Sequence, residues 1–301
     1  MRNLLTMLFG VCILLFAGLQ TNAQDPNTGG TILDPPGPDE GIYAKNTIDE
    51  REYLPYTFLR EADVMWSKTI WRKIDLREDI NLQFYYPQIP DSIRIGERMN
   101  LINTLIYGIQ EDLIRPYVPD NYHEFKTEIS LDEIYKKMGG GIDTFMIPDV
   151  NTQELVPSIV ENKPNPDRVK EYLVKELWFF DRKRSQLEVR LIGICPIYMD
   201  FREDDIDELE PIPKKLFWVY YPDARYLLSH QEVFNWSGTD AERRTYDDVF
   251  INRYFSSYIV QESNMYNNRS INEYSIGVEA LLEAERIKNT IFDFEQDLWE
   301  Y

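Results

Sequence analysis

The stretch from Glu171 to Pro222 constrains the fold most, because its apolar residues follow the period of two that β-strands require. In its first arm, two apolar sets occupy alternate positions: Tyr172, Val174, Trp178 and Phe180 form one, and Leu173, Leu177 and Phe179 form the other. In its second arm, the alternation is carried by Leu187, Val189, Leu191 and Cys195. The residues that alternate with this second set are polar at the start of the arm and isoleucines near its end. Both arms are therefore predicted to be strands packed against other elements.

Two further segments complete the predicted sheet. Asp181 to Ser185 is polar and suits a hairpin loop between the arms. Leu216 to Tyr221 is rich in aromatic and β-branched residues, and Pro222 is expected to end this third strand because proline cannot donate to a strand ladder. The sequence predicts an α+β fold in which a small antiparallel sheet at Glu171 to Pro222 is covered by helices, because a sheet this small needs such support.

Helical spacing of apolar residues makes the N-terminal half mainly helical in this prediction. Residues 59–75 predict one helix, from the spacing of Ala62, Met65, Trp66, Ile70 and Ile74. Residues 80–87 (INLQFYYP) predict a short strand or an extended segment. Residues 96–114 predict a second helix, which Pro116 ends.

Capping signals mark two more helices. Ser130 and Glu133 form a capping-box pattern before a short helix that a glycine triplet ends. Residues 143–167 are loop-like and are the predicted boundary between two subdomains. Thr239 and Glu242 form another capping-box pattern, before a predicted helix over 241–259 whose inward residues are Tyr246, Val249, Phe250 and Tyr254.

A C-terminal helix carries the most continuous apolar stripe, formed by Ala280, Ala284, Ile287, Ile291, Phe294 and Leu298. Two arrangements explain such a stripe. The helix packs on the sheet of its own subunit, or it forms a coiled coil with a partner. The stripe is short for a coiled coil, which favours the first arrangement.

The N-terminus predicts export. Residues 1–23 contain Arg2, an apolar run and a small residue, Ala23, before polar Gln24, as in a cleaved signal peptide. The run is short for a membrane anchor, and Gln24 stands where a lipoprotein would have cysteine. Residues 24–55 are dense in proline and glycine and predict an extended arm. Residues 56–301 form the predicted α+β body.

Composition excludes several functions. The net charge is −20, which disfavours nucleic acid and anionic membrane surfaces and favours a basic protein partner. After signal removal Cys195 is the one remaining cysteine, in an apolar strand that suits a buried hydrophobe. His123 and His230 lack zinc-site spacing, and the acidic run Glu203 to Glu210 lacks the glycine and ligand alternation of a calcium loop. No catalytic, cofactor-binding or metal-binding residue is therefore predicted.

Mixed aromatic and charged blocks are the most specific feature of the sequence. They occupy residues 59–87, 176–196, 216–225, 240–259 and 279–301, the last ending in Trp299, Glu300 and Tyr301. These blocks resemble the GldN/PorN family of the type IX secretion and gliding machinery. The resemblance implies a non-enzymatic periplasmic protein that forms a ring with the GldK/PorK outer-membrane lipoprotein and with other copies of itself. It also implies contact with the GldM/PorM motor component.

Two segments are predicted to contact partners. Arg182, Lys183 and Arg184 make a basic turn on an acidic protein, which suits an acidic patch of a neighbouring subunit or a solvated turn. The arm carries more apolar residues than an inert linker needs, among them Ile32, Leu33, Ile42 and Tyr43, and is predicted to order on a neighbour. The alternative functions are a secreted acidic hydrolase and a periplasmic ligand-binding protein.

Overall fold

The structure is a computed structural model, which describes residues 51–88, 98–120, 124–148, 155–162, 164–201, 211–233 and 243–297. The described residues belong to the unit Arg51–Tyr301. Several predictions fall elsewhere in the chain: the signal peptide, nearly all of the arm, His123, the acidic run and the Thr239/Glu242 pair. Within the described ranges, no helix has the length and apolar character needed to cross a membrane.

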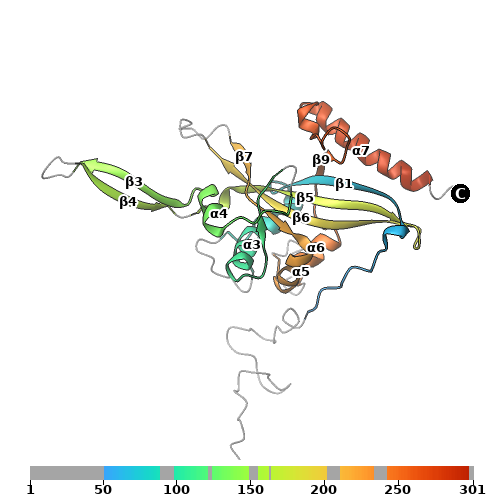
Figure 1. The fold of residues 1–301 in the computed structure, drawn as a ribbon, viewed down its shortest axis with the longest axis horizontal. Coiled ribbons are helices and arrows are strands. Elements are labelled where there is room, and N and C mark those ends of the chain that lie inside the picture. The colour runs from blue at the N-terminus through green and yellow to red at the C-terminus, as the bar shows by residue number, and fades with distance from the viewer. Residues whose placement is uncertain are drawn as a thin grey trace, which may run out of the picture. The chain divides into compact units, whose positions relative to one another are not determined.

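A seven-stranded antiparallel sheet lies at the centre of this unit (Figure 1). The strand order is β2-β8-β6-β5-β1-β9, and β7 pairs with β6. The strands are β1 (Val64–Asp75), β2 (Pro116–Tyr117), β5 (Val169–Asp181), β6 (Gln186–Asp200), β7 (Ile212–Lys215), β8 (Trp218–Tyr220) and β9 (Tyr258–Glu262). The three predicted strands correspond to β5, β6 and β8, and β8 pairs with β6 through Val219 and Ile194. The α+β prediction is confirmed, although the sheet extends well beyond Glu171 to Pro222.

The predicted helix over residues 59–75 is wrong. This segment forms a short 3-10 turn, η1 (Glu61–Asp63), and then β1, which pairs with β5 along its length. Trp66, Ile70 and Ile74 are four residues apart, and this spacing places residues on one side of a strand as well as on one side of a helix. The segment is a strand and not a helix because it pairs with β5, which lies about 100 residues later in the sequence.

The short strand or extended segment predicted over residues 80–87 is also wrong. The chain forms η2 (Asp79–Asn81) and a single helical turn, α2 (Leu82–Tyr85). The buried Asn81 side chain donates to the carbonyl oxygens of Asp75 (2.8 Å) and Ser256 (3.0 Å) and accepts from the Ser256 N–H (3.0 Å). These tertiary hydrogen bonds hold the turn in place.

The loop predicted over residues 143–167 is wrong as well. Most of it belongs to β3 (Gly141–Pro148) and β4 (Leu155–Asn162), which form a separate two-stranded sheet, and η4 (Pro166–Arg168) follows. Pro148 and Pro157 lie in these strands and made the segment resemble a loop. A two-stranded ribbon leaves one edge of each strand unpaired, so proline is tolerated there.

The helices agree better with the sequence in the first half of the chain. Helix α3 (Leu101–Gln110) lies within the predicted range, and the Asn100 side chain accepts from the Asn103 N–H at 2.9 Å. Helix α4 (Leu131–Lys137) begins at the predicted cap, where Ser130 Oγ accepts from the Glu133 N–H at 3.4 Å. Both caps satisfy backbone donors that a helix start leaves free.

The helices in the second half of the chain differ from the prediction. Helix α5 (Tyr221–His230) was not predicted; Pro222 lies in its first turn, where a missing N–H costs little. The predicted helix over 241–259 is reduced to α6 (Tyr246–Ile251), whose capping box joins Thr245 and Asp248. Arg253 adopts φ 56°, which breaks the helix, and the chain continues into β9. Tyr246, Val249 and Phe250 are buried as predicted, whereas Tyr254 is exposed.

The C-terminal helix, α7 (Val278–Asp297), follows the 3-10 turn η5 (Ile271–Glu273). Its residues Ala284, Ile287 and Ile291 are buried in a cluster with Ile70 of β1 and Ile259 of β9. The ring of Trp66 stacks on that of Phe294, with centroids 4.8 Å apart. The helix therefore packs on the sheet of its own subunit, as the sequence favoured.

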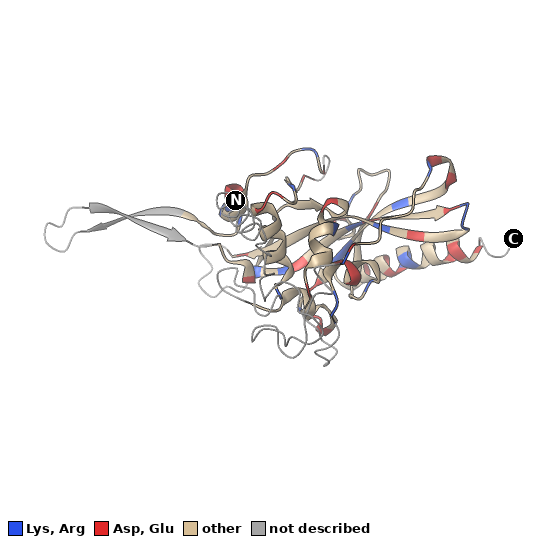
Figure 2. Ribbon diagram, turned by 90° about the horizontal axis from the view of Figure 1, so that it is seen from below, with Lys and Arg blue, Asp and Glu red and all other residues tan. Residues whose placement is uncertain are grey.

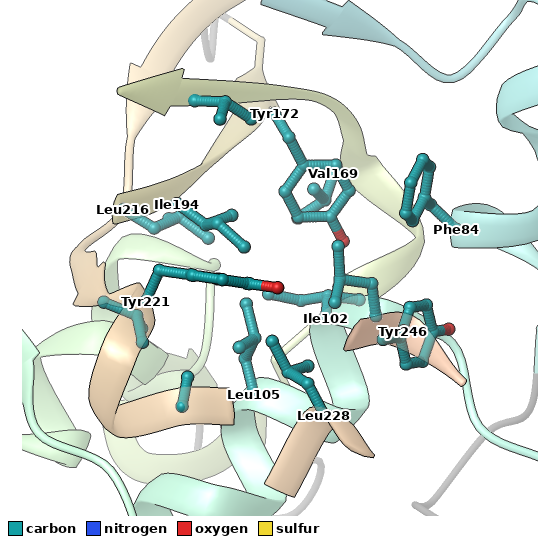
Figure 3. Packing of buried hydrophobic residues seen from close by; sticks show 14 of the residues in the cluster. Phe84, Ile102, Leu105, Val169, Tyr172, Ile194, Leu216, Tyr221, Leu228 and Tyr246 are labelled. Atoms are coloured by element: carbon teal, nitrogen blue, oxygen red, sulfur yellow. The ribbon is translucent and has the colours of Figure 1, made fainter. Parts of the chain in front are cut away.

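The largest apolar cluster lies between the sheet and helices α3, α5 and α6. In Figure 3, Tyr172 and Ile194 of the sheet face Leu105 and Leu228 of the helices. Figure 1 shows these helices together beside one part of the long strands, with α7 alongside β9. A separate cluster contains Trp71, Leu173, Cys195, Ile197 and Trp218. Residues Tyr172 and Leu173 thus enter different clusters, which confirms the two apolar faces predicted for β5.

Gly193 of β6 lies under the ring of Phe125, on the face of the sheet that carries the cluster with Cys195 and Trp218. A Cβ atom on Gly193 would lie 2.5 Å from Cζ of Phe125 and 3.0 Å from the carbonyl oxygen of Val219. No side chain fits at that distance, so the ring of Phe125 requires glycine beneath it.

Candidate partner-binding surfaces

A buried ion pair fixes the start of the described chain to the helices. Arg225 of α5 and Asp247 of α6 have side chains only 2% and 7% exposed, and they share two hydrogen bonds of 3.0 and 3.1 Å. Arg225 also donates to the carbonyl oxygen of Leu54 at 2.6 Å. Its guanidinium lies over the rings of Tyr53 and Tyr56. The last residues of the predicted arm therefore contact the body.

Hydrogen bonding to Asp247 keeps this pair charged. Burial acts to lower the pKa of Arg225, but the hydrogen bond to Asp247 and its charge outweigh burial, so the pKa is raised. Tyr221 donates to Asp247 at 2.7 Å, and its own pKa is raised, mainly by burial and then by the Asp247 charge. Arg225, Asp247 and Tyr221 are all buried, so this network holds α5 and α6 together.

A second charged group is centred on Glu176 of β5. Glu176 lies between Val174, which belongs to the largest apolar cluster, and Trp178, which packs against the α7 cluster. Glu176 is fully buried, pairs with Arg253 at 2.9 Å and accepts from the indole N–H of Trp178 at 2.9 Å. Arg72 lies nearby and donates to the hydroxyl (2.8 Å) and carbonyl (2.7 Å) oxygens of Ser257. Burial lowers the pKa of Arg72. This group carries two positive charges for one negative charge beside α7.

An apolar groove opens next to this charged group. Its volume is about 440 Å³, and its apolar walls are Trp178, Leu187, Ile259, Ile291 and Phe292. Its charged lining residues are Arg72, Lys288 and Glu295. A groove of this size is large enough to hold an apolar side chain of another protein.

The outer side of α7 is an unusual surface for a helix that already packs on its own sheet. We define the α7 outer face as Val278, Leu281, Leu282, Glu285 and Asp293, all exposed. Leu282 is 65% exposed and Val278 is 72% exposed. Figure 2 shows Asp and Glu recurring along this helix near the C-terminus, with few Lys or Arg. Exposed apolar residues grouped in this way are typical of an interaction surface.

A basic pocket of about 370 Å³ lies at the other end of the long strands. We define it by its four cationic residues, Lys73, Arg77, Arg168 and Lys170. Its apolar wall consists of Met199, Phe201, Pro211 and Pro213, and among the residues that the structure describes Glu171 is the carboxylate in its lining. Such a concentration of positive charge stands out on a chain whose net charge is −20.

The model of the family described as "Gliding motility associated protein GldN" matches residues 59–300. The chain belongs to the GldN family. None of the curated proteins compared with it matches. The predicted family is therefore confirmed, and the groove, the α7 outer face and the basic pocket all lie within the matched residues of this GldN-family chain.

The predicted basic turn of this GldN-family chain is exposed but surrounded by carboxylates. Arg184 pairs with Glu188 at 2.6 Å and lies 3.8 Å from Asp181. The Lys183 N–H donates to the Asp181 carboxylate at 2.8 Å, and the Arg182 N–H donates to the carbonyl oxygen of residue 63 at 2.8 Å. Partner contact by Arg182, Lys183 and Arg184 stays a prediction. Ile32, Leu33, Ile42 and Tyr43 lie outside the described residues.

Groups with reactive potential are few in the described part of this GldN-family chain. There, no set of three His, Cys, Asp or Glu residues is arranged to hold a metal ion. Cys195 is fully buried, and burial raises the pKa of its thiol to about 12. His230 lies at the end of α5, with Nδ1 2.7 Å from the carbonyl oxygen of Tyr226. Cys195 is thus the buried hydrophobe that the sequence predicted.

Sequence reasoning missed the basic pocket. Its cations come from β1, from the turn that follows it, from η4 and from β5. Lys73 and Arg77 stand close together in sequence, but they occur among ordinary mixed charges. The pairing of β1 with β5 places Asp75 opposite Glu171, and so brings Lys73 and Arg77 close to the start of β5.

Proposed function

We propose that this GldN-family chain is a non-enzymatic structural component of the type IX protein secretion and gliding machinery. It acts in the periplasm, held at the outer membrane by a GldK/PorK-like lipoprotein with which it forms a ring. It also contacts the periplasmic part of a GldM/PorM-like motor component. The observation that carries the proposal is the family match over residues 59–300.

The surfaces support a role in assembly. The described part of the chain combines an apolar groove, an exposed apolar helix face and a basic pocket, each suited to a protein partner. The one cysteine among these residues is buried with a raised pKa, so it is unsuited to nucleophilic catalysis.

Co-purification from the cell envelope tests the proposal. A tagged chain expressed from its own locus is expected to recover the GldK/PorK-like lipoprotein after detergent extraction, whereas a tagged unrelated periplasmic protein recovers none. Deletion of the chain is expected to abolish gliding and secretion together. Recovery without the lipoprotein, or a deletion strain that glides and secretes normally, contradicts the proposal.

A second experiment separates assembly from catalysis. Cys195→Ser and His230→Asn are expected to leave secretion intact, because neither residue acts chemically in the proposed role. Loss of secretion in a variant that is folded and still recovers the lipoprotein favours the hydrolase alternative.

A further inference from the structure

We propose that the region where η5 meets α7 binds a different protein, one whose apolar residues are bordered by lysine or arginine. We define the η5–α7 corner by four exposed apolar side chains, those of Met265, Tyr266, Tyr274 and Ile276. This corner and the α7 outer face together form the proposed binding surface. The inference rests on the proposed function, because it assigns the surface to contact with another component of the machinery and not with a second copy.

The first argument is the amount of apolar surface that remains in water. Met265 is 88% exposed and Ile276 is 85% exposed. Val278 and Leu282 continue this surface along the start of α7. All of these residues belong to one continuous part of the chain, residues 265–282. Single exposed apolar residues are normal on a protein surface, but a group of this kind marks an interaction site.

The second argument is that the corner is held in a fixed conformation. The side-chain oxygen of Asn264 accepts from the Tyr266 N–H at 3.0 Å. Ser270 and Glu273 form a capping box at η5. Between them, Ile271 is buried in the apolar cluster under α7. The exposed apolar side chains are therefore presented by an ordered segment, so a partner that binds them has little chain entropy to overcome.

Stacked side chains make the corner continuous with α7. The guanidinium of Arg269 lies over the ring of Tyr274, 4.5 Å from its centroid, and over the ring of Tyr266 at 5.9 Å. The Tyr274 hydroxyl donates to the carboxylate of Glu283 in α7 at 3.3 Å. Tyrosine and arginine are among the residue types that contribute most to binding at protein interfaces.

The third argument is charge, which decides the kind of partner. Arg286 of α7 is already paired with Glu283 at 2.5 Å. Lys288 is paired with Glu285 at 3.2 Å. Three exposed carboxylates of α7 have no ion pair among the described residues: Glu279, Asp293 and Asp297. Negative charge therefore remains beside the apolar surface, and it favours a partner with lysine or arginine at the border of the contact.

The same charges argue against a second copy as the occupant. A symmetric contact places the carboxylates of two α7 helices opposite each other, and like charges across an interface are unfavourable. The net charge of −20 makes other faces of a second copy a poor match as well. In residues 24–50, Lys45 is the one basic residue. The acidic residues of that segment are Asp25, Asp34, Asp39, Glu40, Asp49 and Glu50. A different protein of opposite charge fits the surface better than any part of this chain.

Photo-crosslinking in the cell envelope tests the contact. A photoreactive phenylalanine analogue replaces Ile276 in one strain and Leu113, an exposed residue that follows α3, in a control strain. Mass spectrometry identifies the captured protein and the peptide joined to the analogue. The analogue at Ile276 is expected to capture a protein other than this chain, at a peptide where apolar residues adjoin lysine or arginine. Capture of another copy, of lipid, of no protein, or of the same protein from Leu113 overturns the inference.

Removal of apolar side chains tests the first argument, with the captured protein purified and its Kd for the chain from Gln24 onward measured. Ile276→Ser with Leu282→Ser is expected to raise the Kd about tenfold or more. Leu113→Ser with Ile251→Ser removes two exposed apolar residues elsewhere and should leave the Kd unchanged. Equal Kd values for the two double variants overturn the inference. Circular dichroism confirms folding, and alanine replaces serine if a variant unfolds.

Charge reversal tests the third argument. Glu279→Lys with Asp293→Lys is expected to raise the Kd about tenfold at low salt and to reduce its salt dependence, because dissolved ions screen the attraction to basic residues. Glu52→Lys with Glu111→Lys changes the net charge equally at two other exposed positions and is the matched control. Binding that the α7 variant retains in full, or that salt does not weaken in the unaltered chain, overturns the inference.

The outcomes also distinguish this inference from the proposed function. If the corner captures no protein while the chain still recovers the lipoprotein and supports gliding and secretion, the inference is wrong and the proposed function stands. If the corner binds a basic protein as described but the chain never recovers the lipoprotein, the proposed function is wrong and the binding surface stands.

Discussion

Replacing Asp247 by alanine measures how much the buried ion pair contributes to the stability of the fold. Asp247 accepts hydrogen bonds from Arg225 at 3.0 and 3.1 Å and from Tyr221 at 2.7 Å. The alanine variant leaves the Arg225 guanidinium, 2% exposed, without a counter-charge. Removal of one partner from a buried pair costs about 3–5 kcal/mol, because the remaining charge stays desolvated.

Urea unfolding followed by far-UV circular dichroism is the appropriate measurement. We expect the unfolding free energy of Asp247→Ala to fall by about 3–5 kcal/mol. The neighbouring residue provides the control. Asp248 is 24% exposed, pairs with Arg51 and caps α6, so Asp248→Ala should cost about 0.5–2 kcal/mol, as capping residues do.

A double replacement identifies the cause. Arg225→Met with Asp247→Leu removes both charges while keeping apolar volume, and it should be considerably more stable than Asp247→Ala alone. An Asp247→Ala variant that loses less than about 1 kcal/mol, or no more than Asp248→Ala, refutes the reasoning, since water or another group must then reach Arg225.

Two further predictions concern Cys195 and α7. In the folded chain from Gln24 onward, Cys195 should react with a thiol reagent only as fast as the protein unfolds, and rapid labelling at about pH 8 would count against its burial. Because its pKa rises from 9.0 to about 12 on folding, the unfolded thiol ionises first, so stability should decline as pH increases from about 9 toward 12. Ile287→Ala, at a residue 2% exposed, should destabilise the protein by about 2–5 kcal/mol and change the fluorescence of Trp66. Leu282→Ala, at a residue 65% exposed, should stay within about 0.5 kcal/mol, and equal losses for the two variants would contradict the packing of α7.

The sequence by itself determined the elements whose signals are local. Alternation of apolar residues identified β5 and β6, and capping chemistry placed the start of α4 at Ser130. The stripe through Ala284, Ile287 and Ile291 identified α7 and its buried side. These signals survive because a residue's position on a strand or helix face follows from spacing along the chain.

The features that depend on contacts between segments distant in sequence were decided by the tertiary structure alone. Trp66, Ile70 and Ile74 satisfy both periods, and the segment became β1 because β5 supplies a partner along its whole length. Residues 80–87 became a turn because buried Asn81 finds hydrogen-bond partners at Asp75 and Ser256. The basic pocket likewise exists because β1 and β5 pair side by side. Charged residues from separate segments come together in one site only when the sheet forms. The spacing of residues along the sequence does not show which strands pair, so it could not predict this pocket.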